Sequence, residues 1–167
     1  MLRTLAARLD ALFRRREIPI ARVATWLAVG PALPSRDYRA LVRRGVTHVV
    51  DLRAETMDDE QALSALGIRH LNVPVPDRST PTDEQFELLE QWVSEVETGG
   101  GVVYLHCQAG LQRTAVVAAA LLVRRGMTAG DAFRALQLAR PGANPTEAQH
   151  AWFRRIDAEV RLQRPSG

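Results

Sequence analysis

The sequence predicts one α/β domain with a mostly parallel sheet. Short apolar runs rich in β-branched residues alternate along the chain with segments of helical periodicity, which is the pattern of strands joined by crossover helices. A length of 167 residues fits a single domain. The composition, 46% hydrophobic and 25% charged, is that of a globular protein and excludes a disordered or collagen-like chain.

The expected elements follow from apolar spacing and from the residues that interrupt it. Leucines three and four residues apart predict a basic amphipathic helix within residues 1–19, and the main domain is expected over 20–167. The strands are expected at 23–29, 46–52, 68–73 and 102–105. The helices are expected at 35–44, 56–66, 82–98, 113–125, 128–140 and 146–163.

Glycine and proline mark the boundaries of these elements. Gly45, Gly67 and Gly126 stop the helices that precede them, because glycine adopts the left-handed conformation of a helix end at little cost. Prolines at 74, 76 and 81 force an irregular loop before the helix at 82–98. That helix should begin with a capping box, since Thr82 is followed three residues later by Gln85.

The charge and the cysteine content of the chain exclude several classes of function. All 22 basic residues are arginine, which eliminates mechanisms that need a lysine. Five arginines lie in residues 1–16, and the remaining chain has a net charge of −1, so we expect no nucleic-acid partner. A single cysteine excludes an internal disulfide and favours a reducing compartment, the cytoplasm. No apolar run approaches the ~20 residues of a membrane span.

The chemistry-bearing residues are concentrated in 106–114, between an expected strand and an expected helix. Backbone N–H groups of such a loop, with the positive end of the helix dipole, form an anion site, and Gly110 lets the backbone approach the anion. The same field would hold Cys107 as a thiolate. The Arg113 guanidinium can bind two phosphate oxygens, and the Thr114 hydroxyl can stabilise the sulfur as a leaving group. These groups indicate phosphoryl transfer through a cysteinyl phosphate.

This run resembles the signature of the cysteine-dependent protein tyrosine and dual-specificity phosphatases: His106-Cys107, five further residues, then Arg113-Thr114. The order of elements over residues 20–160 is similar to the small dual-specificity type, as are Asp51-Leu52-Arg53 and Arg140-Pro141-Gly142 followed by Gln149. The resemblance implies a five-stranded sheet flanked by helices and hydrolysis of phosphomonoesters without metal or cofactor. It also implies a mobile aspartate that protonates the leaving oxygen.

The expected general acid is Asp77, in the proline-constrained loop 30 residues before Cys107. Asp83 is the nearest competitor, but capping and the helix dipole explain a carboxylate there. Asp58 and Asp59 are interpreted as a solvated helix start.

Other residues receive roles from the same resemblance. His106 would orient the loop without transferring protons, and Gln149 would position the hydrolytic water, although a helix-surface glutamine is an open alternative. Phosphate is expected to contact the loop residues Gln108, Ala109, Gly110, Leu111, Gln112 and Arg113. The other histidines have no metal-ligand spacing, so no metal site is expected.

The hypothesis is a dual-specificity-type protein phosphatase that acts on phosphotyrosine and also on phosphoserine and phosphothreonine. Its alternatives are a phospholipid phosphatase at a membrane surface, a rhodanese-like sulfurtransferase and a non-catalytic phosphate-binding module. Persulfide transfer needs no acid such as Asp77, which disfavours the sulfurtransferase. A binding module needs no thiol, which disfavours the phosphate-binding module. The N-terminal helix could pack on the domain, mediate dimerisation or contact an anionic membrane, and the sequence leaves the oligomeric state open.

Overall fold

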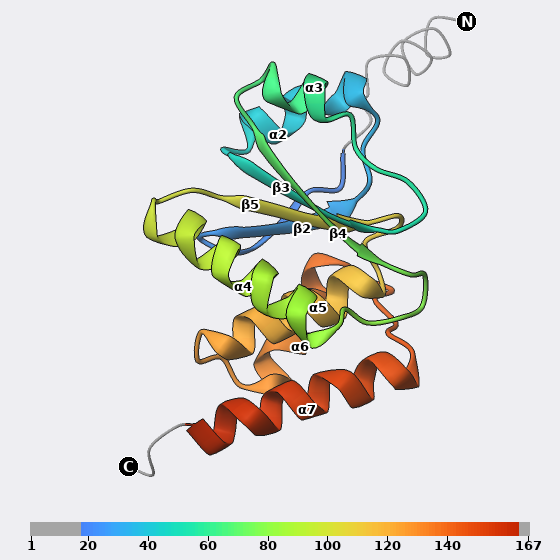
Figure 1. Ribbon diagram of the computed structural model, residues 1–167, viewed down its shortest axis with the longest axis vertical. Helices are drawn as coiled ribbons and strands as arrows, with labels where there is room; N and C mark the ends of the chain where they lie inside the picture. Colours follow the sequence, from blue (N-terminus) through green and yellow to red (C-terminus); the bar gives the residue numbers. More distant parts are fainter. Residues whose placement is uncertain (1–17, 164–167) are drawn as a thin grey trace, which may run out of the picture.

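The computed structural model describes residues 18–163, and the amphipathic helix expected at the N-terminus falls outside these described residues. The sheet has five strands in the order β1-β2-β5-β3-β4 (Figure 1). Among the pairs that these strands form, only β1–β2 is antiparallel, so the predicted mostly parallel sheet is confirmed. The strands are β1 (Ala21–Ala24), β2 (Leu27–Pro31), β3 (His48–Arg53), β4 (Arg69–Val75) and β5 (Val103–Cys107).

Helices cover both faces of the sheet (Figure 1). One face packs against the larger hydrophobic core, contributed by α4 (Asp83–Thr98), α5 (Arg113–Arg124), α6 (Ala129–Ala139) and α7 (Glu147–Gln163). The other face packs against a smaller core, to which Tyr38, Leu41 of α2 (Arg39–Arg43) and Leu63 of α3 (Glu60–Ser64) contribute buried side chains. The 3-10 helix η1 (Ser35–Asp37) precedes Tyr38 and buries no residue of its own. In the central helix α5, the residues from Arg113 to Val123 are all buried, because sheet and helices surround it.

Three expected elements differ from the structure, and one of them is the helix expected at 35–44, which is divided into η1 and α2. The single strand expected at 23–29 is a tight hairpin in which Ala21 pairs with Val29 and Ala24 with Leu27. No glycine or asparagine marks its turn, so the usual hairpin signal is missing from the sequence. The helix expected at 56–66 is the shorter α3, capped by the Asp59 side chain, which accepts a hydrogen bond from the Ala62 amide.

The alternation of side chains along β5 separates two sets of functional groups. Val103, Leu105 and Cys107 belong to the face covered by α4–α7, whereas Tyr104 packs with the smaller core. Successive residues of a strand point to opposite faces, so His106, stacked on Tyr104, lies on the side away from Cys107. The nucleophile candidate and its neighbouring histidine therefore have different surroundings although they are adjacent in sequence.

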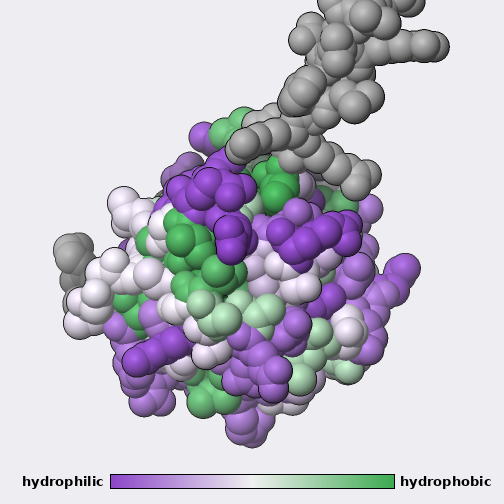
Figure 2. All heavy atoms as spheres, turned by 90° about the horizontal axis from the view of Figure 1, so that it is seen from above, coloured by the Kyte–Doolittle hydropathy of each residue, from purple (hydrophilic) through white to green (hydrophobic). Residues whose placement is uncertain are grey.

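The surface of residues 18–163 carries no large apolar face in the view of Figure 2, where hydrophobic residues form small groups separated by hydrophilic ones. The exposed large hydrophobic side chains, among the described residues, are scattered over several elements: Val42, Met57, Leu88, Leu138 and Leu162. Across the same residues, none of the helices combines the length and the apolarity that crossing a bilayer requires.

The end of β2 supports the loop that follows β5. The Ala32 amide donates to the Gln108 carbonyl over 3.1 Å. Gly110 has a φ of 70°, and a Cβ there would overlap the Gly30 carbonyl. A Cβ at Gly30 would in turn overlap the Tyr104 hydroxyl and lie 2.7 Å from the Pro19 carbonyl oxygen. Both positions need glycine because two backbone segments meet there.

We predict that Gly30→Ala lowers the free energy of unfolding by about 1–3 kcal/mol, because the added methyl group has no space. Urea denaturation measures the change. The matched control is Gly130→Ala, since a Cβ at that position in α6 meets nothing within 4 Å. That substitution should raise stability by up to about 1 kcal/mol, from helix propensity alone. Equal effects of the two substitutions would contradict the close approach at Gly30.

Candidate active site

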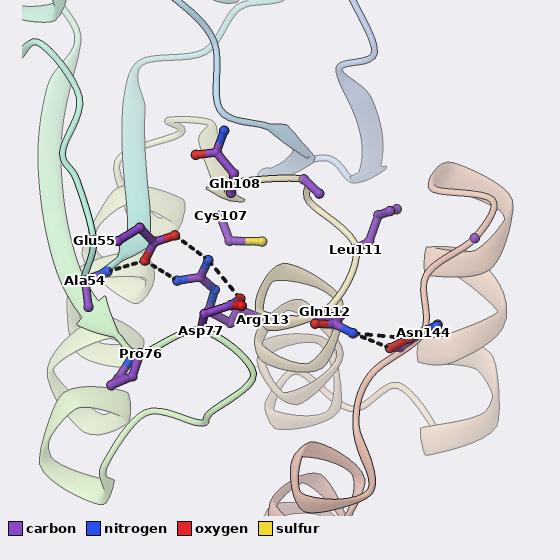
Figure 3. A pocket seen from close by; sticks show the side chains of 12 residues that line it. Ala54, Glu55, Pro76, Asp77, Cys107, Gln108, Leu111, Gln112, Arg113 and Asn144 are labelled. Atoms are coloured by element: carbon purple, nitrogen blue, oxygen red, sulfur yellow. Dashed lines mark hydrogen bonds and ion pairs between the residues drawn. The ribbon is translucent and has the colours of Figure 1, made fainter.

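A cleft of about 690 Å³ opens at the carboxyl end of β5, where the chain turns into α5. The Cys107 sulfur projects into the space between Gln108, Leu111 and Arg113 (Figure 3). The structure thus brings the predicted nucleophile, the arginine and Asp77 to one cleft, with four of the predicted loop residues in its lining: Gln108, Ala109, Leu111 and Gln112. Gly110 does not line the cleft and instead packs against Gly30.

The surroundings of Cys107 favour its thiolate. Burial by itself would raise the pKa of the thiol, but hydrogen bonds from the Thr114 side chain and from the Thr114 and Gly110 amides, with the Arg113 charge, lower it below the ordinary value. The buried Thr114 hydroxyl has no oxygen or nitrogen partner among the described residues, so its hydrogen is available to the sulfur. Thr114 therefore lies beside the Cys107 sulfur, and the role predicted for it stays a prediction.

Arg113 is held in a fixed orientation by an ion pair. Its Nη1 and Nη2 donate to the two carboxylate oxygens of Glu55 over 2.8 and 2.7 Å (Figure 3). Nη1 also donates to the Val75 carbonyl over 2.9 Å. The bond from Arg113 lowers the pKa of Glu55 to about 2, so the pair persists at any pH near neutrality. Glu55 is not among the residues predicted from the sequence, where its position two residues after Asp51-Leu52-Arg53 is the only available signal.

Asp77 reaches the cleft from the loop after β4. Its Oδ1 lies 3.4 Å from Nη2 of Arg113, and 70% of its side chain is exposed. The carboxyl group is thus close to the loop between β5 and α5, here called the cysteine loop (residues 108–112), without being buried in it, which is the placement a general acid needs. Asp83 forms an ion pair with Arg155 and does not line the cleft.

Behind the cysteine loop, His106 belongs to a buried ionic cluster. Its Nε2 lies 2.8 Å from Oδ2 of Asp58, and Nη2 of Arg53 donates to both Asp51 and Asp58 over 2.8 Å. The interpretation of Asp58 as a solvated residue is wrong, since only 7% of it is exposed. Helical spacing in the sequence could not reveal this, because its partner His106 lies 48 positions away on β5. Arg53 further donates to the Gln108 side chain over 3.3 Å, which links the cluster to the cysteine loop.

The same cluster contains three potential metal ligands, Asp51, Asp58 and His70, whose ligand atoms lie within 4.8 Å of one another. The Arg53 guanidinium already occupies both carboxylates, and a cation would have to displace it. The geometry is that of an internal ion-pair network and does not fit a metal centre.

Gln149 lies apart from the cleft. It is fully buried at the start of α7, where its Oε1 accepts from the Thr146 amide over 2.8 Å and its Nε2 donates to the Ser79 carbonyl over 2.8 Å. The side chain is not among those that line the cleft, and it is not a surface residue. The sequence allowed two interpretations of Gln149, a glutamine on the helix surface and a glutamine that positions the hydrolytic water. Each requires an exposed side chain, and the Gln149 side chain is buried.

Comparison with known proteins identifies the family of this chain. A family model described as "Polymorphic toxin system, DSP-PTPase phosphatase" matches residues 30–127. Dual specificity phosphatase 28 of Homo sapiens is 30% identical over 149 residues, which cover 87% of this chain and 81% of the human protein. The Mus musculus protein of the same name is 31% identical and 88% covered, again over 87% of this chain. The chain belongs to the dual-specificity phosphatase family.

Solved structures of phosphatases share the fold. A mouse putative dual specificity phosphatase, solved in complex with zinc tungstate, superimposes with a TM-score of 0.77 at 28% identity, covering 90% of this chain and 93% of the mouse chain. The active form of Tk-PTP superimposes with a TM-score of 0.76 at 26% identity, covering 84% of this chain and 97% of that one. This dual-specificity-type protein phosphatase therefore acts on phosphorylated substrates.

We predict that the Cys107 thiol of this dual-specificity phosphatase is alkylated by iodoacetamide at a pH below that required by an ordinary cysteine, because its pKa is lowered. Above that pKa the thiolate reacts, and below it the protonated thiol does not. Thr114→Val should move the alkylation midpoint to higher pH, since it removes one group that stabilises the thiolate. The measurement is the alkylation rate between pH 4 and 9; an unshifted midpoint would exclude the hydroxyl from this role.

Proposed function

We propose that this phosphatase hydrolyses phosphomonoesters through a cysteinyl-phosphate intermediate, without a metal ion. The supporting observation is the junction of β5 and α5, where Cys107, with its lowered pKa, and Arg113 line one cleft. A thiolate at the end of a strand, an anion-binding loop and a fixed guanidinium are sufficient for nucleophilic attack on phosphorus.

In the first step, the Cys107 sulfur attacks phosphorus, an S–P bond forms, and the bond to the leaving oxygen breaks. The phosphoryl oxygens accept hydrogen bonds from loop backbone amides and from Arg113, which Glu55 holds in orientation. Asp77 gives its proton to the leaving oxygen, so a neutral alcohol or phenol departs. This role is supported by its place on a separate loop at the mouth of the cleft.

In the second step, water attacks the phosphocysteine. Asp77, now a carboxylate, accepts a proton from the water, the S–P bond breaks, and its electron pair returns to sulfur. The groups that lower the pKa of Cys107 stabilise the departing thiolate, and the Thr114 side chain is foremost among them. Inorganic phosphate is then released, and the enzyme returns to its starting state.

The cleft favours a substrate with one phosphate group. Among the described residues that line it, Arg113 is the one with a cationic side chain, and Glu55 and Asp77 are acidic. A lipid headgroup with several phosphates would need further cations, which this lining lacks. We therefore propose proteins phosphorylated on tyrosine, and also on serine or threonine, as the substrates. A cytoplasmic location is proposed with them, since a single thiol that must stay reduced favours a reducing compartment.

We predict that Cys107→Ser abolishes hydrolysis of p-nitrophenyl phosphate in excess EDTA, a condition in which the wild type remains active. Serine at this position lacks the thiolate that attacks phosphorus. The measurement is p-nitrophenol release, and tungstate binding by both proteins controls for an intact phosphate loop. Turnover by the serine variant, or loss of wild-type activity in EDTA, would contradict the covalent metal-free mechanism.

We predict that Asp77→Asn reduces kcat/KM about 100-fold or more for alkyl phosphates and much less for p-nitrophenyl phosphate. An alkoxide needs a proton to leave, whereas nitrophenolate leaves without one. The measurement is a series of phosphate esters ordered by the pKa of the leaving group. Asp83→Asn is the matched control, because Asp83 lies outside the cleft. An equal loss on all esters would assign a structural role to Asp77.

A further inference from the structure

Two helix caps contact the segment that carries Asp77, here called the acid loop (residues 74–79), which begins with the last two residues of β4. The first belongs to α4. The Gln85 amide donates to Oγ1 of Thr82 over 3.2 Å, and the Thr82 amide donates to Oε1 of Gln85 over 2.9 Å, which completes the capping box predicted from the sequence. The remaining polar atom of the glutamine, Nε2, donates to the Pro74 carbonyl over 3.0 Å. The cap of α4 thus holds the beginning of the acid loop.

The cap of α7 repeats this arrangement at the other end of the acid loop. The Gln149 amide donates to Oγ1 of Thr146 over 3.2 Å, and the Thr146 amide donates to Oε1 of Gln149 over 2.8 Å. Nε2 of Gln149 donates to the Ser79 carbonyl over 2.8 Å, and Oγ1 of Thr146 lies 3.4 Å from the Arg78 carbonyl. The two glutamines therefore make the same set of hydrogen bonds at opposite ends of this six-residue segment.

The residue type at these positions is informative. A capping box needs only a side-chain acceptor at its third helical position, and glutamate serves there as well as glutamine. Glutamine adds a donor on the same group, so that one side chain caps its helix and binds a neighbouring carbonyl. Burial agrees with this double use, since Gln149 is fully buried and Gln85 is half-buried.

Between the two contacts, the acid loop forms a strained turn. The Ser79 amide donates to the Pro76 carbonyl over 3.0 Å, and Arg78 has a φ of 61°, the one positive value among the non-glycine residues described. A left-handed conformation at a residue with a Cβ persists only where surrounding contacts hold it. Asp77 is the first central residue of this turn, so the direction of its carboxyl group depends on those contacts.

We propose that Gln85 and Gln149 are positioning residues that hold the acid loop from both ends and so aim Asp77 at the leaving oxygen. The inference rests on the proposed function of Asp77 and deepens it. It also replaces the water-positioning role that resemblance suggested for Gln149, whose side chain is buried away from the cleft with both polar ends engaged.

The test uses Gln85→Glu and Gln149→Glu, which keep an oxygen for the cap but remove the donor to the acid loop. A misplaced acid should lower kcat/KM for alkyl phosphates about tenfold or more, with a change below about threefold for p-nitrophenyl phosphate. Gln149→Met is included because it removes the donor without placing a charge in a buried site. All three variants should shift the leaving-group dependence in the direction of Asp77→Asn.

The matched control is Asp131→Asn at the start of α6. The Asp131 amide donates to Oγ1 of Thr128 over 3.2 Å, and that hydroxyl donates back to the Asp131 side chain over 2.8 Å. This cap resembles the other two but has no hydrogen bond to the acid loop. We expect the control to change thermal stability without changing the leaving-group dependence; a changed dependence would overturn the specific role of the two glutamines.

Two further measurements distinguish a failure of this proposal from a failure of the proposed function. If Gln149 positions water instead, its variants will accumulate phosphocysteine and release a burst of p-nitrophenol before the steady state, and that result overturns the proposal. Amide hydrogen exchange at Asp77, Arg78 and Ser79 reports on the acid loop without any turnover; we expect faster exchange in the variants, and unchanged exchange overturns the proposal. Absence of wild-type turnover would instead refute the proposed function, and exchange alone would then decide whether the glutamines hold the loop.

Discussion

The position of β5 between β2 and β3 is the constraint on which the rest of the structure depends. Parallel pairing on both sides buries this strand completely and brings its carboxyl end to the start of α5. Cys107 therefore meets the amides of a helix N-terminus, and those amides help to lower its pKa. The close approach of Gly110 to Gly30 is a consequence of the same pairing, since β2 ends directly beside the loop.

Successive side chains of β5 point to opposite faces of the sheet, so groups on both faces contribute to the site. The side chain next to the nucleophile, His106, points to the opposite face and joins Asp58, Arg53 and Asp51 in a buried cluster. Burying charges costs free energy that only close partners offset, so removing one partner from such a cluster is strongly destabilising. The cluster contacts the cysteine loop through the hydrogen bond from Arg53 to Gln108. A hydrogen bond has a preferred direction, so it supports the loop more specifically than apolar packing would.

The remaining groups reach the cleft from separate loops. Glu55 follows β3, Asp77 follows β4, and both approach Arg113, since their strands end on the same edge of the parallel sheet. A loop has no strand pairing of its own to fix its conformation, so its side chains must be positioned by contacts from outside. Hydrogen bonds from the caps of α4 and α7 supply such contacts on either side of Asp77.

The sequence by itself determined the local features: the strand, loop and helix around residues 106–114, the capping box of α4, the mostly parallel sheet and the family. These depend on spacing and on neighbouring residue types. Only the tertiary structure decided that Asp58 is buried, that Glu55 holds Arg113 and that Gln149 reaches Ser79. Each is a contact across 48, 58 or 70 positions of the chain, made where strand ends and helix starts converge, and no periodicity within one segment records it.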